Sequence, residues 1–295
     1  MDSLNRWLTI VLMAMIAWSG GTGISAATTE TAANLVPPLF AMDPAVRRMT
    51  GTIDQKLDEL KKLGYSGLST NSASPKNLNE VIAAAEWREM RVYALYMACP
   101  LTTSGIELSE DFDQICQILG EHNVLLWFYM PSKVYEPSDL SGDEIAVPAL
   151  RAAADRAAKY SLKIALYHHK DNWIEPFSDA LRVAAKVDRP NLGVSFNLSH
   201  ALYAGEENKI PELLKSAGDK LFMVTVNGAD TNAAGAGWDR LIQPLGRGSY
   251  NLTRFVKVIR ELGYKDAIGF QTFGIKDELT GMLRDSHTSW TTLAQ

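Results

Sequence analysis

Eight short apolar runs alternate with eight helical patterns along the chain, and this alternation limits the possible folds more than any other feature. The runs are rich in β-branched and aromatic residues, which is typical of buried parallel strands. We expect strands at 39–42, 65–69, 92–97, 124–130, 163–169, 192–198, 222–227 and 267–272. We expect helices at 52–64, 76–89, 109–121, 149–160, 177–187, 210–218, 252–263 and 277–293.

Strand–helix units repeated in this way predict an α/β fold, a closed (β/α)₈ (TIM) barrel. An open doubly wound sheet is the alternative, but no glycine-rich phosphate loop follows the run at 39–42. The first long helix shows clear end signals, because Thr52 and Gln55 form a possible capping box and Gly64 a stop. No low-complexity linker interrupts the pattern. Residues 34–295 are therefore expected to form one barrel domain.

The amino terminus has the order of an export signal. Arg6 precedes the apolar stretch 7–18, and the small residues Ser25, Ala26 and Ala27 follow it. A membrane anchor is less favoured because a span needs about 20 apolar residues. We expect residues 1–27 to be a signal peptide and 28–33 a flexible leader. The mature protein would then be exported, periplasmic or extracellular, and free of the membrane.

The composition of the chain limits the kinds of partner that it can bind. The formal net charge is -5, which argues against a nucleic-acid surface, so a small-molecule partner is expected; the oligomeric state is left open. Export would permit a disulfide between Cys99 and Cys116. One lies at an expected strand end and the other well inside the next helix, too far apart for a bond. Two free, mostly buried thiols are predicted.

Polar residues gather where the last four expected strands end, which is where TIM barrels carry their chemistry. A single histidine at a strand end is more often a hydrogen-bonded structural residue than a functional one. Four neighbouring strands that all end in polar groups favour a polar pocket instead. The groups are Tyr167, His168, His169, Lys170 and Asp171; Asn197, Ser199 and His200; Thr225, Asn227 and Asp230; and Gln271 and Thr272.

Within this set, His169 and His200 are the candidates for a general base, because an imidazole ordinarily titrates near neutral pH. Asp230 or Asp171 would orient the base. The expected substrate contacts are hydroxyl and amide groups that bind sugar hydroxyls, two tryptophans that either stack on a sugar ring or pack in loops, and an arginine that either holds an anion or caps its loop. They are Tyr167, Asn197, Thr225, Asn227, Gln271, Trp173, Trp238 and Arg247.

Two segments carry a family resemblance. The stretch PLGRGSYNLTRFVKVIRELGYKDAIGFQTFG (244–274) and the motif GVSFNLSH (193–200) are similar to those of the xylose isomerase-like TIM barrel superfamily. That superfamily includes sugar phosphate isomerases and epimerases, hydroxypyruvate isomerases and AP endonuclease IV-like enzymes. The resemblance covers nearly the whole mature chain and implies a TIM barrel and sugar chemistry. The segments YHH (167–169), FNLSH (196–200), VNGAD (226–230) and FQTFG (270–274) also resemble those of an exported bacterial branch of this superfamily.

The resemblance also implies a divalent metal on strands five to eight, and here the sequence departs from it. The matching positions are Tyr167, Asn197, Thr225 and Gln271, which are all neutral. A hard divalent cation needs carboxylates to offset its desolvation. We therefore expect no metal and no cofactor.

Three functions remain open. The first is a metal-independent enzyme that isomerises, epimerises or β-eliminates a sugar or keto-sugar by histidine-assisted proton transfer. The second is a carbohydrate-binding barrel without catalysis. The third is a metal enzyme with a rebuilt site at His168, His169 and His200, which is disfavoured because neighbouring residues on a strand point to opposite sides. DNA repair is disfavoured by the net negative charge and by the lost metal ligands. A phosphate-ester substrate is disfavoured because export would separate the protein from phosphorylated metabolites.

Overall fold

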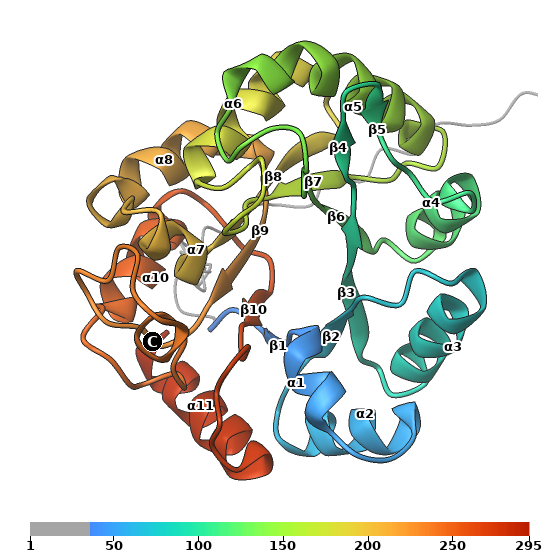
Figure 1. The fold of residues 1–295 in the computed structure, drawn as a ribbon. Coiled ribbons are helices and arrows are strands. Elements are labelled where there is room, and N and C mark those ends of the chain that lie inside the picture. Colours follow the sequence, from blue (N-terminus) through green and yellow to red (C-terminus); the bar gives the residue numbers. More distant parts are fainter. Residues whose placement is uncertain (1–35, 295) are drawn as a thin grey trace, which may run out of the picture. The chain divides into compact units, whose positions relative to one another are not determined.

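The structure is a computed structural model that describes residues 36–294, and within this range eight parallel strands close into a barrel. Their order around the ring is β1, β10, β9, β8, β7, β6, β3, β2, and helices cover the outside (Figure 1). The barrel strands are β1 (Leu39–Ala41), β2 (Gly67–Thr70), β3 (Arg91–Ala98), β6 (Leu125–Tyr129), β7 (Ile164–Tyr167), β8 (Leu192–Asn197), β9 (Leu221–Val226) and β10 (Ile268–Phe270). The predicted (β/α)₈ fold is confirmed. The expected signal peptide and leader lie outside the described residues.

The long helices lie where the apolar periodicity predicted them. Thr52 and Gln55 form the expected capping box at the start of α2. The helix after β6 begins earlier than predicted, at Asp143, and Pro148 lies inside it. The long helices are α2 (Ile53–Lys62), α3 (Pro75–Glu86), α4 (Phe112–Glu121), α5 (Asp143–Ala158), α6 (Phe177–Val187), α8 (Ile210–Ala217), α10 (Leu252–Glu261) and α11 (Leu279–Leu293).

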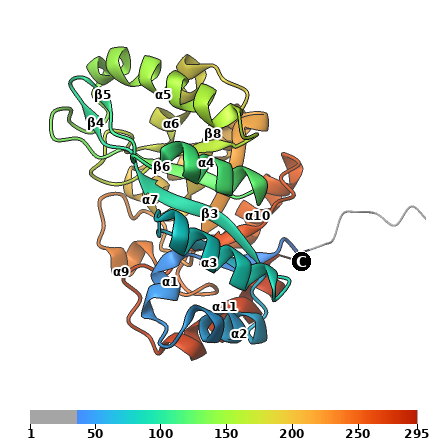
Figure 2. The same ribbon diagram turned by 90° about the vertical axis from the view of Figure 1, so that its right-hand side faces the viewer.

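Several short elements escaped the sequence analysis, and they gather at the carboxyl ends of the strands. Figure 2 shows them on one end of the barrel. Each is too short to show a hydrophobic period, which needs more than one or two turns. They are α1 (Asp43–Arg48), α7 (Leu198–Tyr203), α9 (Trp238–Leu241) and the hairpin of β4 (Leu101–Thr102) with β5 (Gly105–Ile106).

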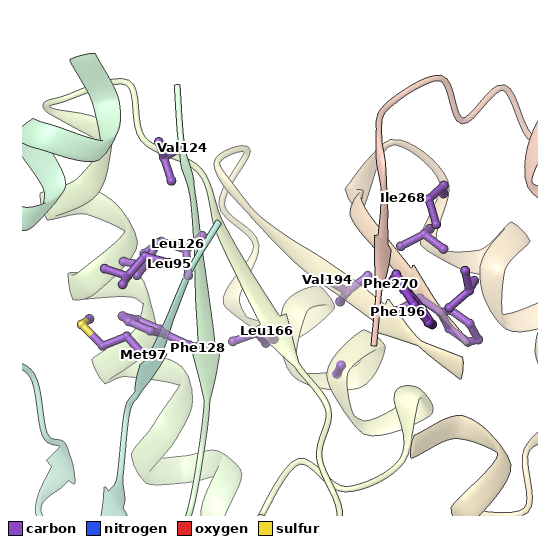
Figure 3. Packing of buried hydrophobic residues seen from close by; sticks show 14 of the residues in the cluster. Leu95, Met97, Val124, Leu126, Phe128, Leu166, Val194, Phe196, Ile268 and Phe270 are labelled. Carbon is purple, nitrogen blue, oxygen red and sulfur yellow. The ribbon is translucent and has the colours of Figure 1, made fainter. Parts of the chain in front are cut away.

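Alternation along each strand separates two layers of packing. Leu126, Phe128 and Leu166 point outward and pack against the helices (Figure 3). Trp127 and Tyr167 point inward and belong to a second, smaller cluster. Because successive side chains on a strand face opposite sides, the residue that ends each strand decides what faces the barrel mouth.

Two further expectations concern cysteines and membranes. Cys99 and Cys116 are free and buried, as predicted. Among the described helices none is both long and apolar enough to cross a membrane.

Candidate functional site

A cavity of about 790 Å³ lies at the carboxyl ends of the barrel strands. Of the residues expected at the site, Tyr167, His169, His200, Trp238 and Gln271 line it. The rest of the wall comes from the first half of the chain and was not anticipated. It includes Asp43, Arg47, Tyr96, Tyr129 and Glu107.

The side chain of Asn197 forms a hydrogen-bonded network below this cavity. Its Nδ2 donates to the Tyr167 hydroxyl at 2.7 Å and to Thr225 Oγ1 at 2.8 Å. Its Oδ1 accepts from Ser199 Oγ at 2.6 Å and from the His200 backbone N–H at 3.2 Å. All the hydrogen-bonding capacity of this amide is therefore used within the protein. We expected Asn197 and Thr225 to contact the substrate directly. Instead, their side chains bond to each other and hold the floor of the cavity.

This network does not fit a divalent cation. The Asn197 amide directs N–H groups at Tyr167 and Thr225, so two of the positions that match the family's metal ligands receive donors from a third. A cation would face these N–H groups and would find no carboxylate among the four positions. No group of three or more His, Cys, Asp or Glu side chains within residues 36–294 is placed to hold a metal ion.

The backbone of Lys170 sets the tautomers of the two cavity histidines. Nδ1 of His169 lies 2.6 Å from the Lys170 carbonyl oxygen, which only accepts, so this Nδ1 carries the proton. Nδ1 of His200 accepts from the Lys170 backbone N–H at 3.3 Å, so in the neutral ring the proton is on Nε2. Nε2 of His169 is consequently a free base and Nε2 of His200 an N–H donor. Neither Nε2 atom has a hydrogen-bond partner in the described part of the chain.

The two rings lie side by side. Their centroids are 4.3 Å apart, and the edge of His200 meets Trp238 at 5.4 Å. A ring with an unprotonated nitrogen and a ring with an N–H donor thus line one cavity from adjacent positions. Such a pair suits removal of a proton from carbon together with polarisation of a neighbouring carbonyl.

His168 lies apart from this pair. It is fully buried between Phe177 and Phe196. Its Nε2 accepts the backbone N–H of Asn197 at 3.0 Å, and its Nδ1 lies 3.3 Å from the Glu175 carbonyl oxygen. Both ring nitrogens are therefore occupied, and His168 holds the end of β7 against β8.

Burial keeps the three histidines neutral. It lowers the pKa of His168 to about 3 and the pKa of His200 well below its ordinary value. It also lowers the pKa of His169, although the hydrogen bond to Lys170 opposes this. The unprotonated imidazole that a general base requires is thus favoured in all three rings.

Besides Asn197 and Thr225, four more expected site residues do not line the cavity. Trp173 is fully buried and donates its Nε1–H to the Asp139 carbonyl oxygen at 2.8 Å. Asn227 donates to the carbonyl oxygens of Gly228 and Leu241, both at 2.7 Å. Asp230 pairs with Arg240 at 3.2 Å, and Arg247 pairs with Asp277 at 2.7 Å. These side chains stabilise the loops after their strands, so the structure does not support the expectation that Asp230 orients a histidine.

The missed residues had a weak signal in the sequence. Asp43 directly follows the first strand, at the position where polar residues were noted after the last four strands. Tyr96 and Tyr129 lie on strands and looked like ordinary core residues. In the structure their rings stack at 4.2 Å on the cavity wall.

The Asn197 network predicts that the purified protein binds no divalent metal stoichiometrically. Elemental analysis of protein purified without chelators is the measurement, and we expect far less than one zinc or manganese ion per chain. About one tightly held ion per chain would contradict this prediction and would favour the rebuilt histidine site.

The buried histidines predict a loss of stability in mild acid. The unfolded chain takes up protons near pH 6.5, whereas the native rings titrate only at lower pH. The stabilisation is therefore nearly complete above about pH 6.5 and decreases as the pH falls. For His168, whose native pKa is about 3, the loss approaches about 1.4 kcal/mol per pH unit below the pKa of the unfolded ring. Denaturant unfolding at pH 6.5 and pH 5 measures this slope. His168→Gln should reduce the number of protons taken up on unfolding, and hence this slope, by about one proton's contribution. Equal slopes in both proteins would refute the prediction.

Comparison with known proteins agrees with the fold. The model of the xylose isomerase-like TIM barrel family matches residues 57–290. A segment of 172 residues is 23% identical to inosose isomerase of Bacillus licheniformis; it covers 57% of this chain but only 60% of that protein. The crystal structure of the IolI protein with a bound zinc atom superposes with a TM-score of 0.68 at 19% identity, over 87% of this chain and 98% of the other.

A second solved structure is equally similar in fold. The 3-keto-D-glucoside 4-epimerase of E. coli superposes with a TM-score of 0.68 at 17% identity, over 87% of this chain and 99% of the other. At such low identity the structural matches show the fold alone. The family match, however, covers most of the barrel described above. The chain therefore belongs to the xylose isomerase-like TIM barrel family.

Proposed function

We propose that the protein is an enzyme that moves a proton at the carbon next to the carbonyl of a keto-sugar, without a metal ion. The observation that carries this proposal is the complementary pair of tautomers at His169 and His200. One ring offers a lone pair and its neighbour offers an N–H, and both line the cavity. The sequence left His169 and His200 as alternative bases; the hydrogen bonds that both rings form with Lys170 favour His169.

In the proposed step, Nε2 of His169 removes the proton from the carbon. The electron pair of the broken C–H bond moves to form a C=C bond, and the carbonyl oxygen takes up the negative charge. Nε2–H of His200 donates a hydrogen bond to this oxygen. A neutral imidazole serves well as such a donor because it polarises the carbonyl without bringing a buried charge. Return of the proton to a carbon completes an isomerisation or an epimerisation.

The wall of the cavity supports a sugar as the substrate. Tyr96, Tyr129 and Trp238 supply aromatic surface, and Gln271 supplies an amide. The backbone N–H groups of Thr272 and Phe273 donate to the Gln271 carbonyl oxygen, so its NH₂ group remains as the donor, with the Tyr167 hydroxyl as a neighbour. Aromatic faces with a few oriented polar groups are typical of carbohydrate pockets. The similar proteins, an inosose isomerase and a 3-keto-D-glucoside 4-epimerase, agree with this substrate class.

Paired substitutions distinguish the two histidine roles. We expect His169→Gln and His169→Ala to lower kcat by about 10²- to 10⁴-fold, since neither replacement can accept the proton. At residue 200, glutamine retains an N–H donor near the position of Nε2. His200→Gln should therefore keep much more activity than His200→Ala.

The measurement is uptake of solvent deuterium by a panel of sugars, keto-sugars, oxidised glycosides and uronates, followed by NMR. Melting temperatures of all four variants control for folding. Equal loss in His200→Gln and His200→Ala with normal melting would remove the donor role of His200. Saturable binding with no deuterium uptake by the unaltered protein would replace the enzyme with a carbohydrate-binding barrel.

We also propose that the protein is exported and acts in the periplasm or outside the cell. The support is the order of Arg6, the apolar run and the small residues that follow. Amino-terminal sequencing of the protein from its native host should find a mature chain that begins near Thr28. A chain that retains Met1 in the cytosolic fraction would contradict export.

A further inference from the structure

Asp43 faces the histidine pair from the other side of the barrel. It follows β1, whereas His169 follows β7. In the closed ring, β7 is four places from β1 in either direction, so the two strands are diametrically opposed. Both residues line the same cavity. A ligand between them would have His169 on one face and Asp43 on the other.

The surroundings of Asp43 differ from those of the other carboxylates in the cavity wall. Only 6% of Asp43 is exposed, whereas Glu107 and Asp171 are exposed residues. Asp171 also pairs with Lys170, on the same side as the histidines. Among the described residues that line the cavity, Asp43 is the one buried carboxyl group.

The contacts of Asp43 hold it in place, whereas its burial favours the protonated carboxyl group. Its backbone N–H donates to Ser69 Oγ at 3.1 Å, and its Oδ2 pairs with Arg47 Nε at 3.0 Å. Burial raises the pKa of the carboxyl group, although Arg47 opposes this. Its charge also reaches the barrel interior, where it adds to the effect of burial in raising the pKa of Tyr167.

An acidic residue in the first turn of a helix often serves only to stabilise that helix. That role does not require burial, and Asp54 in the first turn of α2 fulfils it at the surface, where it pairs with Arg88. Asp43 instead lies in the cavity wall, and its charge adds to the effect of burial in raising the pKa of Tyr96 and of Tyr167. Its position therefore calls for an explanation beyond the helix.

We propose that Asp43 is the second proton-transfer residue of this site, and that the reaction is an epimerisation with inversion at the carbon next to the carbonyl. This rests on the proposed function. His169 Nε2 takes the proton from one face, and the electron pair passes to the carbonyl oxygen. The protonated Asp43 carboxyl then delivers its proton to the other face as the carbonyl re-forms. One C–H bond breaks and one forms; His169 is left protonated, Asp43 ionised, and exchange with solvent restores both.

The test separates exchange from inversion. The substrate is the keto-sugar from the panel that takes up most deuterium, supplied separately as each of its two epimers in deuterated buffer. The unaltered protein should label and interconvert both. Asp43→Asn should still exchange the epimer whose C–H faces His169, but its formation of the other epimer should fall by about 10²- to 10⁴-fold. His169→Gln should show the reverse pattern.

Asp54→Asn is the matched control, because it removes a first-turn aspartate with an arginine partner away from the cavity, and it should behave like the unaltered protein. Retained exchange of one epimer by Asp43→Asn shows that this variant is folded and binds. Normal inversion by Asp43→Asn would overturn the role of Asp43 while leaving the proposed function intact. Loss of exchange from both epimers would overturn it too, because Asp43 would then serve binding or folding. No deuterium uptake by the unaltered protein would instead remove the proposed function itself.

Discussion

The buried amide of Asn197 ties together the part of the barrel on which the candidate site depends. Its four hydrogen bonds join the end of β7 at Tyr167, β9 at Thr225, and the first turn of α7 at Ser199 and His200. In a buried setting, such a network is stabilising only when every member is satisfied. Here the amide is satisfied completely. The short helix that carries His200 therefore begins from a fixed point, and the cavity above it has a floor of neutral groups.

The floor of the cavity is neutral, and charged groups of the site form ion pairs around the cavity. Around the cavity, Asp43 pairs with Arg47 and Lys170 pairs with Asp171. The histidines between them are held neutral by burial. A site of this kind favours an uncharged, hydroxyl-rich ligand, because binding such a ligand leaves no buried charge without a partner.

The sequence was sufficient for the barrel because its signals repeat. Strand and helix periods recur eight times, so an error at one boundary does not alter the fold. The site offered no such repetition. Composition cannot tell which of two loop tryptophans faces the cavity, and Trp238 does while Trp173 is sealed beneath its loop. Asn197 ends a strand and Asn227 follows one, but the Asn197 amide is bonded within the protein and the Asn227 NH₂ group to neighbouring carbonyl oxygens. Asp43 follows β1, outside the polar clusters after the last four strands, so its signal in the sequence was weak.

The tautomers of His169 and His200 could not be read from side chains at all, because both are fixed by the main chain of Lys170. This has an evolutionary consequence. The residue that assigns the two roles does so with its peptide groups, so its side chain is free to drift without exchanging those roles. Only proline, which has no N–H, would release His200. Sequence variability at position 170 would therefore conceal, rather than reveal, its importance, and an alignment would rank as dispensable the position that sets the polarity of the site.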